Sequence, residues 1–269
     1  MQGQSYPSQY PTAQAFPAQG PSSYAGKPSS NYADLEAEPY RASNVYDCSA
    51  AIKAAFIRKV YTILSLQLLL TVGGAATFMF VDSAREFALS SMGVFYTAIF
   101  LPFGILFALM CYKDKHPVNM YLLAAFTICE AYTVGVICAV YQEQGYGMLV
   151  LQALLLTAAV FISLTTYVFV TKKDFSWIGG ALSMGLMILL MWSLMNMIFP
   201  VTFGGFGHSI FSMFGAVLFS GYILYDTSNI MHHMGPDDYI LAAVSLYLDI
   251  INLFLYLLEI LRMLQGGND

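Results

Sequence analysis

The sequence predicts an all-α integral membrane protein, a bundle of seven transmembrane helices preceded by a disordered tail. Two observations support this fold class. Of the 269 residues, 58% are apolar and only 10% are charged, whereas soluble domains carry about 25% charged residues. After residue 50 the apolar residues fall into seven long segments with short connectors, and about 20 such residues are enough for a helix to cross a bilayer.

The first 50 residues have a different composition from the rest of the chain. They hold six of the ten prolines, many Ser, Gln and Tyr residues, and no periodic pattern of aliphatic side chains. Such a segment buries too little apolar surface to fold. We therefore predict a disordered cytosolic tail over residues 1–50 and a transmembrane domain over residues 51–269. The tyrosines and prolines of the tail suit a docking segment for partner proteins.

The seven predicted spans follow one another with connectors of a few residues. They run over Val60–Val81, Phe87–Tyr112, Pro117–Tyr141, Tyr146–Thr171, Phe175–Phe199, Ser209–Met231 and Ile240–Arg262. Backbone groups inside a bilayer must be hydrogen-bonded within their own segment, which favours helices throughout. Pro102 is expected to kink the second span.

The distribution of lysine and arginine predicts the orientation in the membrane. Seven crossings place nine of the eleven basic residues on the side of the N-terminus and only Arg85 and Arg262 on the other. Because basic residues concentrate on the cytosolic side, we expect a cytosolic N-terminus and a luminal or extracellular C-terminus. Asp237 and Asp238, in the last connector, do not change this prediction, since acidic residues weigh little in the rule.

Two aspartates interrupt the last two apolar segments. Asp226 lies five residues before Met231, and Asp249 lies ten residues after Tyr239. A rise of 1.5 Å per residue puts them roughly 8 Å and 15 Å from the same membrane face, on adjacent antiparallel helices. The two carboxyl groups can therefore meet. A carboxylate inside a span is costly, which makes it a candidate functional residue.

Further polar residues repeat at helical spacing beside these aspartates. The candidate pore-lining residues are Glu130 in the third span, Tyr222 and Asn229 in the sixth, and Ser245, Asn252 and Tyr256 in the seventh. They place a polar stripe on each of the last two helices. A hydrated path fits this pattern, and so does a hydrogen-bonded helix interface, since polar side chains also join helices inside membranes.

The remaining chemistry-bearing residues predict no cofactor and no tightly bound metal. The four cysteines form no Cys-x-x-Cys pair, so we expect neither a disulfide nor a zinc site. His232 and His233 adjoin the acidic connector, but neighbouring residues on a helix point in different directions, and a solvated loop fits them better. The chain lacks a phosphate-binding glycine loop, a nucleic-acid patch and the sequence motifs of hydrolases.

Two carboxyl groups in contact have a defined chemistry. They cannot both ionise cheaply, so they share one proton. Such a pair either activates water for peptide cleavage or acts as a proton-controlled latch. Two carboxylates also suit hard cations such as calcium.

Several separate segments resemble the Bax inhibitor family, and more narrowly the lifeguard branch of its transmembrane Bax inhibitor motif proteins. The segments are FIRKVYTILSLQLLLT (Phe56–Thr71), YTVG (Tyr132–Gly135), QALLLTAAVFISLTTYVFVTKKDF (Gln152–Phe175), YILYDTSNI (Tyr222–Ile230) and AAVSLYLDIINLFLYLLEIL (Ala242–Leu261). The resemblance covers residues 50–264, and a proline-rich cytosolic tail also fits that branch.

The resemblance implies a seven-helix protein, not an enzyme, that leaks calcium from the endoplasmic reticulum or Golgi in a pH-sensitive way and restrains cell death. Calcium is then the permeant ion rather than a cofactor, and regulators of cell death are possible partners of the tail. The paired aspartates of the family fall on Asp226 and Asp249, as the proton-sharing latch of the pore. Its basic partner near the cytosolic end of the second helix corresponds to Lys113 or Lys115 in CYKDKHP.

Two other functions stay open at the level of sequence. An intramembrane aspartyl protease also uses a Tyr-Asp on one helix and an aspartate on the next. Its second motif normally reads Gly-x-Gly-Asp, whereas this chain has Tyr247 and Leu248 before Asp249. The third candidate is a non-conducting membrane scaffold that binds cell-death regulators through its tail.

Overall fold

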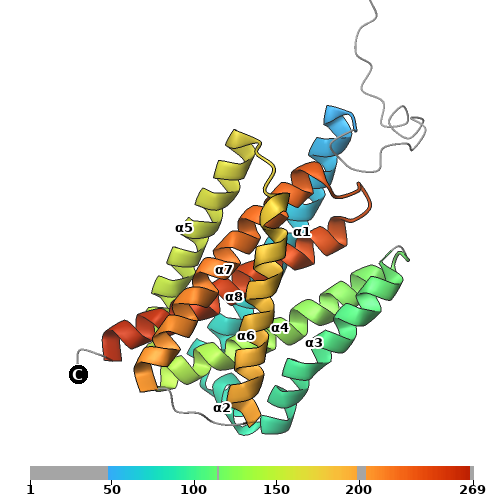
Figure 1. Ribbon diagram of the computed structural model, residues 1–269. Helices are drawn as coiled ribbons and strands as arrows, with labels where there is room; N and C mark the ends of the chain where they lie inside the picture. The colour runs from blue at the N-terminus through green and yellow to red at the C-terminus, as the bar shows by residue number, and fades with distance from the viewer. Residues whose placement is uncertain (1–47, 114, 199–203, 267–269) are drawn as a thin grey trace, which may run out of the picture. The chain divides into compact units, whose positions relative to one another are not determined.

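The computed structural model describes residues 48–113, 115–198 and 204–266, so almost all of the predicted tail lies outside the described residues. The described chain is helical (Figure 1). Its α-helices are α1 (Ala50–Phe80), α2 (Asp82–Ser90), α3 (Met92–Tyr112), α4 (Val118–Glu143), α5 (Gly147–Thr171), α6 (Gly179–Ile198), α7 (Gly204–His232) and α8 (Tyr239–Gly266), and a 3₁₀ turn, Ser176–Ile178, precedes α6.

Seven of these helices, all except α2, are long and apolar enough to cross a membrane. The predicted fold class, an all-α protein with seven membrane spans, is confirmed. Each span forms where the sequence carries a long apolar run, because a helix is the structure that satisfies its own backbone inside hydrocarbon.

The helix bounds differ from the predicted ones near the start of the second span. Residues from Phe87 to Ser90 belong to the separate helix α2, and the helical conformation is interrupted at Ser91 before α3 begins. Helix α2 carries three charged residues, and its Arg85 pairs with Asp82. A short charged helix suits the membrane interface rather than the hydrocarbon core.

Two further features concern continuity within the spans. Helix α1 begins ten residues before the predicted start at Val60, so the basic residues that precede the first predicted span are themselves helical. Pro102 lies inside α3, which continues on both sides of it. Neither feature changes the number of spans.

Helix α8 is the most buried of the seven spans and packs against α7, α5 and α1. The main partner of α1 and of α3 is α4, and α6 packs mainly on α7 (Figure 1). The fully buried side chains Leu64, Phe126, Leu246 and Tyr247 come from α1, α4 and α8. Small residues bring helices close together: a Cβ on Gly215 of α7 would lie 2.6 Å from the ring of Tyr256 on α8.

Three contacts bring the same end of these helices together. Lys113 at the end of α3 pairs with Asp238 before α8 at 3.2 Å, and the ammonium of Lys59 lies 3.3 Å from the ring centroid of Tyr239. The third contact joins the α5–α6 connector to the end of α7 and is described below. We call this the N-side end of the bundle, since α1 also begins there (Figure 1).

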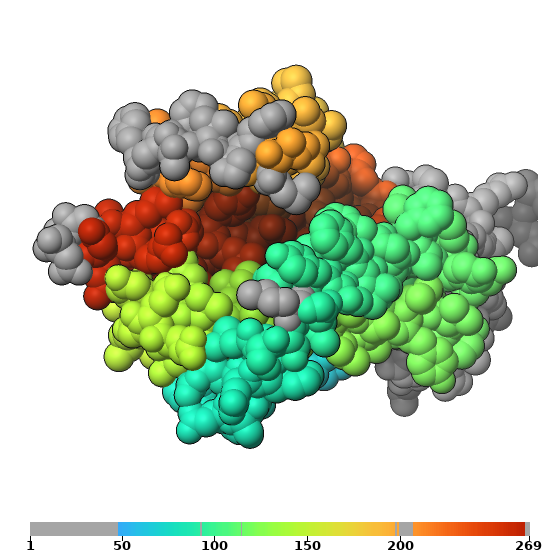
Figure 2. All heavy atoms as spheres, turned by 90° about the horizontal axis from the view of Figure 1, so that it is seen from below, coloured from blue at the N-terminus to red at the C-terminus, as the bar shows by residue number. Residues whose placement is uncertain are grey.

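A hollow is visible from the opposite end of the bundle (Figure 2). Helix α8 lies at its floor, with α2 and α3 to one side and α6 and α7 to the other. Along α8, Ser245, Leu248, Asn252, Leu255 and Glu259 are each only partly buried. Their spacing of three and four residues defines one face of the helix, which is less covered than the faces toward α1, α5 and α7.

Candidate functional site: a buried aspartate pair

The structure brings the side chains of Asp226 and Asp249 into contact. Asp226 lies six residues before the end of α7, and Asp249 lies ten residues after the start of α8. The short connector between these antiparallel helices sets their register. Each carboxyl group hydrogen-bonds the other, and Asn229 also hydrogen-bonds Asp226. The two residues are 9% and 5% exposed, so the pair is almost closed off from its surroundings.

The pair has little to compensate a negative charge. Within the described residues, neither aspartate forms an ion pair with a lysine, arginine or histidine. Atom Oδ2 of Asp249 is buried and has no hydrogen-bond partner. A hydrogen bond between two carboxyl groups needs a proton on one of them. The geometry therefore fits a pair that holds one shared proton.

An aromatic layer lies next to the pair, on the side away from the N-side end. The ring of Phe219 is 5.9 Å from that of Tyr222 and 5.8 Å from that of Tyr256, and Phe211 also packs on Tyr256. The hydroxyl of Tyr222 hydrogen-bonds Ser183 of α6. These rings therefore pack against one another between α7 and α8 beside the pair.

The predicted pore-lining residues of α8 divide between different neighbours. The amide of Asn252 donates to the carbonyl of Leu248 in its own helix at 2.8 Å. Tyr256 belongs to the aromatic layer, and Ser245 lies on the less covered face of α8. The helical spacing predicted which residues share a face of α8 but not which groups each of them contacts. In this conformation the predicted polar residues of α8 do not form one continuous polar row.

A second polar cluster lies at the junction of α1, α4 and α8. Glu130 of α4 is partly buried and lies near Tyr247 of α8, which belongs to this cluster. The hydroxyls of Tyr247 and Thr71 lie 2.8 Å apart, and the amide of Gln67 donates to Thr127 at 3.0 Å. Tyr247 and Asp249 are two residues apart and so point to different sides of α8.

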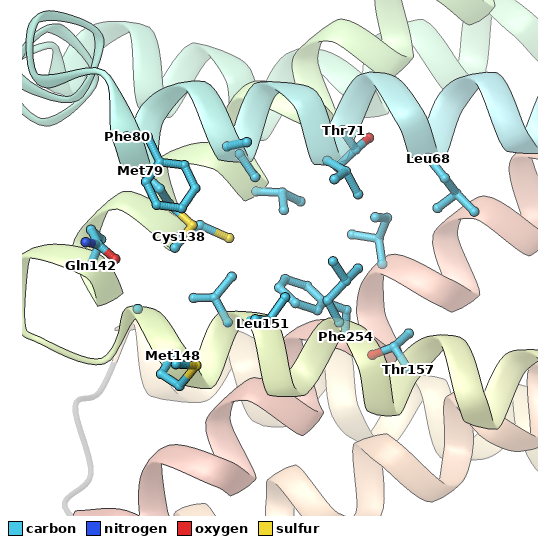
Figure 3. Close-up of a pocket in the computed structure, with 18 of the residues that line it drawn as sticks. Leu68, Thr71, Met79, Phe80, Cys138, Gln142, Met148, Leu151, Thr157 and Phe254 are labelled. Carbon is cyan, nitrogen blue, oxygen red and sulfur yellow. The ribbon is translucent and has the colours of Figure 1, made fainter.

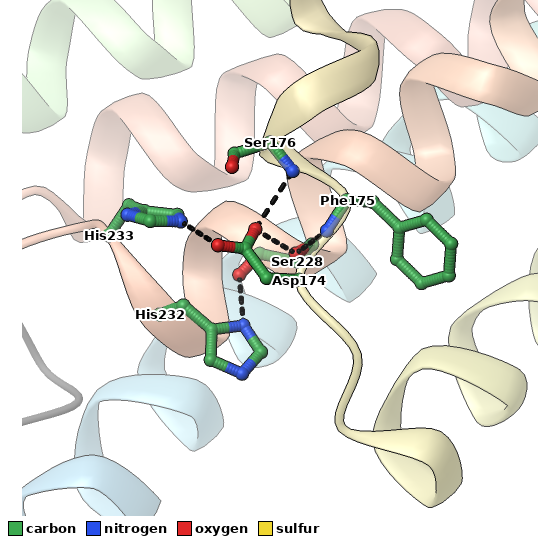
Figure 4. Close-up of polar contacts among 6 residues, drawn as sticks. All are labelled: Asp174, Phe175, Ser176, Ser228, His232 and His233. Atoms are coloured by element: carbon green, nitrogen blue, oxygen red, sulfur yellow. Dashed lines mark hydrogen bonds and ion pairs between the residues drawn. The ribbon is translucent and has the colours of Figure 1, made fainter.

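A third polar cluster closes the N-side end of α7 (Figure 4). Asp174, in the α5–α6 connector, contacts His233 at 2.9 Å, and the backbone N–H of Phe175 donates to Ser228 at 2.9 Å. The backbone N–H of Ser176 and the His233 ring hydrogen-bond Asp174 and lower the pKa of its carboxyl group to about 2. Through Ser228, which lies less than one turn beyond Asp226, the cluster ties the connector to α7.

The two lysines predicted as basic partners contact other groups. Lys113 pairs with Asp238, and the ammonium of Lys115 lies 5.1 Å from the ring centroid of Tyr112. The contact with Asp238 could not be predicted from the sequence, because 125 residues separate the two partners. The contact with Asp238 joins the end of α3 to the connector between α7 and α8.

At the other end of α8, Glu259 joins it to α4. The Tyr141 hydroxyl donates to Glu259 at 2.8 Å, and Arg262 lies 3.5 Å from the same carboxylate. Among the described residues, no group of three or more His, Cys, Asp or Glu side chains is arranged to hold a metal ion.

Residues 53–266 match the sequence pattern of the family described as "Inhibitor of apoptosis-promoting Bax1". The chain belongs to this family. It is 40% identical to the Golgi anti-apoptotic protein of Vaccinia virus (strain Lister) and to protein lifeguard 4 of Mus musculus, over 82% of this chain and 90% of each relative. It is also 40% identical to protein LIFEGUARD 1 of Arabidopsis thaliana, over 79% of this chain and 91% of that protein.

Membership of the Bax inhibitor family confirms the resemblance drawn from the sequence motifs. It identifies an anti-apoptotic membrane protein and not an enzyme, as predicted. The aspartate pair, the aromatic layer and the polar cluster around Asp174 and His233 all lie within the matched residues. Their geometry is therefore the physical basis from which a mechanism for this family member can be argued.

Proposed function

We propose that this protein is a pH-sensitive cation leak channel, with calcium as its permeant ion, gated by Asp226 and Asp249. The observation that carries the proposal is the contact of two carboxyl groups inside a membrane span without a basic partner among the described residues. Polar side chains that only hydrogen-bond across a helix interface need no ionisable group. Two adjacent carboxylates supply the oxygen ligands that calcium prefers.

The latch works through the shared proton. With the proton in place, a hydrogen bond holds α7 against α8 and the aromatic layer stays closed. When the proton leaves, two like charges about 4 Å apart repel each other by on the order of 4 kcal/mol at an effective dielectric near 20. That exceeds the few kcal/mol that separate two helix arrangements. Deprotonation then loosens the pair and admits a cation to the carboxylates.

The relatives support the cellular side of the proposal. One is named a Golgi anti-apoptotic protein. We propose that this chain resides in the Golgi or endoplasmic reticulum, with a cytosolic N-terminus, and restrains apoptosis by lowering stored calcium. Residues 1–50 are then positioned to bind cell-death regulators, and Lys113 or Lys115 remains the proposed basic partner of the pair in an open conformation.

Calcium flux from proteoliposomes tests the proposal. The purified chain should conduct, and the variants Asp226→Asn and Asp249→Asn should each change the pH response of the flux. Glu86→Gln is the matched control, since it removes one exposed carboxylate from α2 and should leave the flux unchanged. A flux and pH response that are identical in all four proteins would contradict the latch.

Deletion of residues 1–50 distinguishes a channel from a scaffold. A channel formed by the helices keeps its flux without the tail, whereas a scaffold shows no flux with or without it. An aspartyl protease would lose cleavage of a helical substrate in both aspartate variants and would conduct in none of the proteins.

A further inference from the structure

A separate cavity of about 440 Å³ lies between α1, α4, α5 and α8. Its lining residues include neither aspartate of the pair. Along α1 it extends from Leu68 to Phe80, about 18 Å at 1.5 Å per residue. Figure 3 shows side chains of α1 and α5 pointing toward each other across it, with Phe254 of α8 between them. Its volume lies in the range of ordinary ligand pockets.

The divergence of two helices produces this cavity. At the N-side end α1 and α5 meet, where the rings of Tyr61 and Phe169 lie 6.0 Å apart. Toward the other end both helices pack on α8 rather than along each other. Three of the lining residues, Val72, Phe80 and Met148, are 41%, 75% and 67% exposed. Because α1 and α5 are membrane spans, the gap between them opens sideways toward the acyl chains of the bilayer.

The inner part of the cavity presents almost only carbon. The hydroxyls of Thr71 and Thr157 donate to carbonyls of their own helices, at 2.9 Å and 2.7 Å. These two threonines therefore offer their methyl groups to the cavity. A polar ligand group placed here would lose its hydrogen bonds with water and gain none, which costs several kcal/mol. The occupant of this part must be hydrocarbon.

The end of the cavity near the α4–α5 turn is different, because Gln142 lies there (Figure 3). Its side-chain amide lies directly over Gly147, where a Cβ atom would overlap its oxygen. Gln142 is one residue from the end of α4, which places it near the level where acyl chains join the head groups of a bilayer. The amide is thus a hydrogen-bonding group at the membrane-interface end of a hydrocarbon slot.

We propose that this cavity binds one acyl chain of a membrane glycerophospholipid, whose ester oxygen accepts a hydrogen bond from the Gln142 amide. An apolar chain followed by an ester at the interface matches both the lining and the position of the amide. The bound chain contacts Ile250, Ile251 and Phe254, on the sides of α8 that face away from α7. It supports α8 immediately after Asp249. The inference is independent of conductance, since it rests on the cavity alone.

Photo-cross-linking in nanodiscs tests the proposal with the full chain. Two phosphatidylcholines are used, one with a diazirine near the ester of an acyl chain and one with it near the chain end. We expect the first to label Gln142 to Leu151 and the second to label residues near Leu68 and Thr157. Ala76→Phe, which fills the cavity, should lower labelling at both levels by about tenfold, equal to 1.4 kcal/mol of affinity.

Gly73→Phe is the matched control, since a Cβ atom added at that position of α1 has no atom of another helix within 4 Å. It should keep the labelling pattern of the wild type. Gln142→Leu leaves the walls intact and should shift or blur the depth of labelling, which keeps the proposal testable if Ala76→Phe does not fold.

The proposal would be overturned if the cavity residues and the outward residue Leu69 were labelled equally, and if both phenylalanine variants lost labelling to the same extent. The probes would then report only bulk lipid. Displacement of the label by added cholesterol would also contradict it, because the occupant would then be a sterol.

Discussion

Asp249 is an ionisable residue whose buried Oδ2 has no hydrogen-bond partner, and its carboxyl group lies against that of Asp226. At high pH both partners carry charge, and their repulsion opposes the packing of α7 on α8. Asp249→Asn should therefore raise the thermal stability of the detergent-solubilised protein at pH 9 while changing it little at pH 5. Asp226→Asn should have the same effect. The double variant should gain little further thermal stability, because each single substitution already removes the one repulsion. An equal loss of thermal stability at both pH values would show that the pair only hydrogen-bonds α7 to α8, with no role for its charge.

Tyr247 is a second residue whose contribution can be measured. It is fully buried, its hydroxyl lies 2.8 Å from that of Thr71, and its ring packs edge-on against Phe126. Tyr247→Phe removes one interhelical hydrogen bond, which in membranes is worth about 0.6 kcal/mol on average. We expect a small fall in the temperature of unfolding. Tyr256→Phe is the control, since its ring packing would be retained. A larger fall for Tyr256→Phe would contradict this assignment.

At the scale of elements, the α5–α6 connector is held to α7 by Asp174 and His233. A lowered carboxyl pKa means stabilisation that is present above the ordinary carboxyl pKa and is lost as the pH falls toward 2. Asp174 therefore stays charged between pH 5 and pH 8. Over this range its carboxylate keeps its contribution to the contact, and that contribution is lost only in acid.

A spin label at Met234 in the α7–α8 connector tests this tie. In the wild type the label should become more mobile as the pH falls from 5 toward 2, because Asp174 then gains a proton and its contacts weaken. Asp174→Asn should raise the mobility of the label at pH 5 and remove most of this response to acid, whereas Glu143→Gln at the opposite end should change neither. A response to acid that survives in Asp174→Asn would assign the movement to another carboxyl group.

The spans and the meeting of the aspartates could be predicted from sequence for a physical reason. Hydrocarbon forces long apolar runs into helices, and a short connector fixes the register of α7 against α8. Helix α2 was missed because an interfacial helix with charged residues gives no hydropathy signal. The contact of Tyr247 with Thr71 joins residues 176 apart, and Lys113 with Asp238 joins residues 125 apart. Such pairings depend on how the helices pack, which one sequence does not state.

At the scale of the whole molecule, the seven candidate spans predict that the two ends of the chain lie on opposite sides of the membrane. We expect a tag at the N-terminus to be accessible when only the plasma membrane is permeabilised, and a tag after residue 269 to be protected. A tag in the connector between α4 and α5 should be protected as well. Access to both terminal tags would mean that one of the seven helices does not cross.

The central claim is that loss of the shared proton opens the protein. It is tested most directly by measuring calcium flux and the protonation of the carboxyl groups, by infrared spectroscopy, on the same proteoliposomes across a pH series. The Asp249→Asn variant identifies the infrared band of the pair. We expect flux to rise over the pH range in which that band loses its proton, and to lose this rise in the variant. Flux that rises on acidification, while the pair gains its proton, would contradict the account.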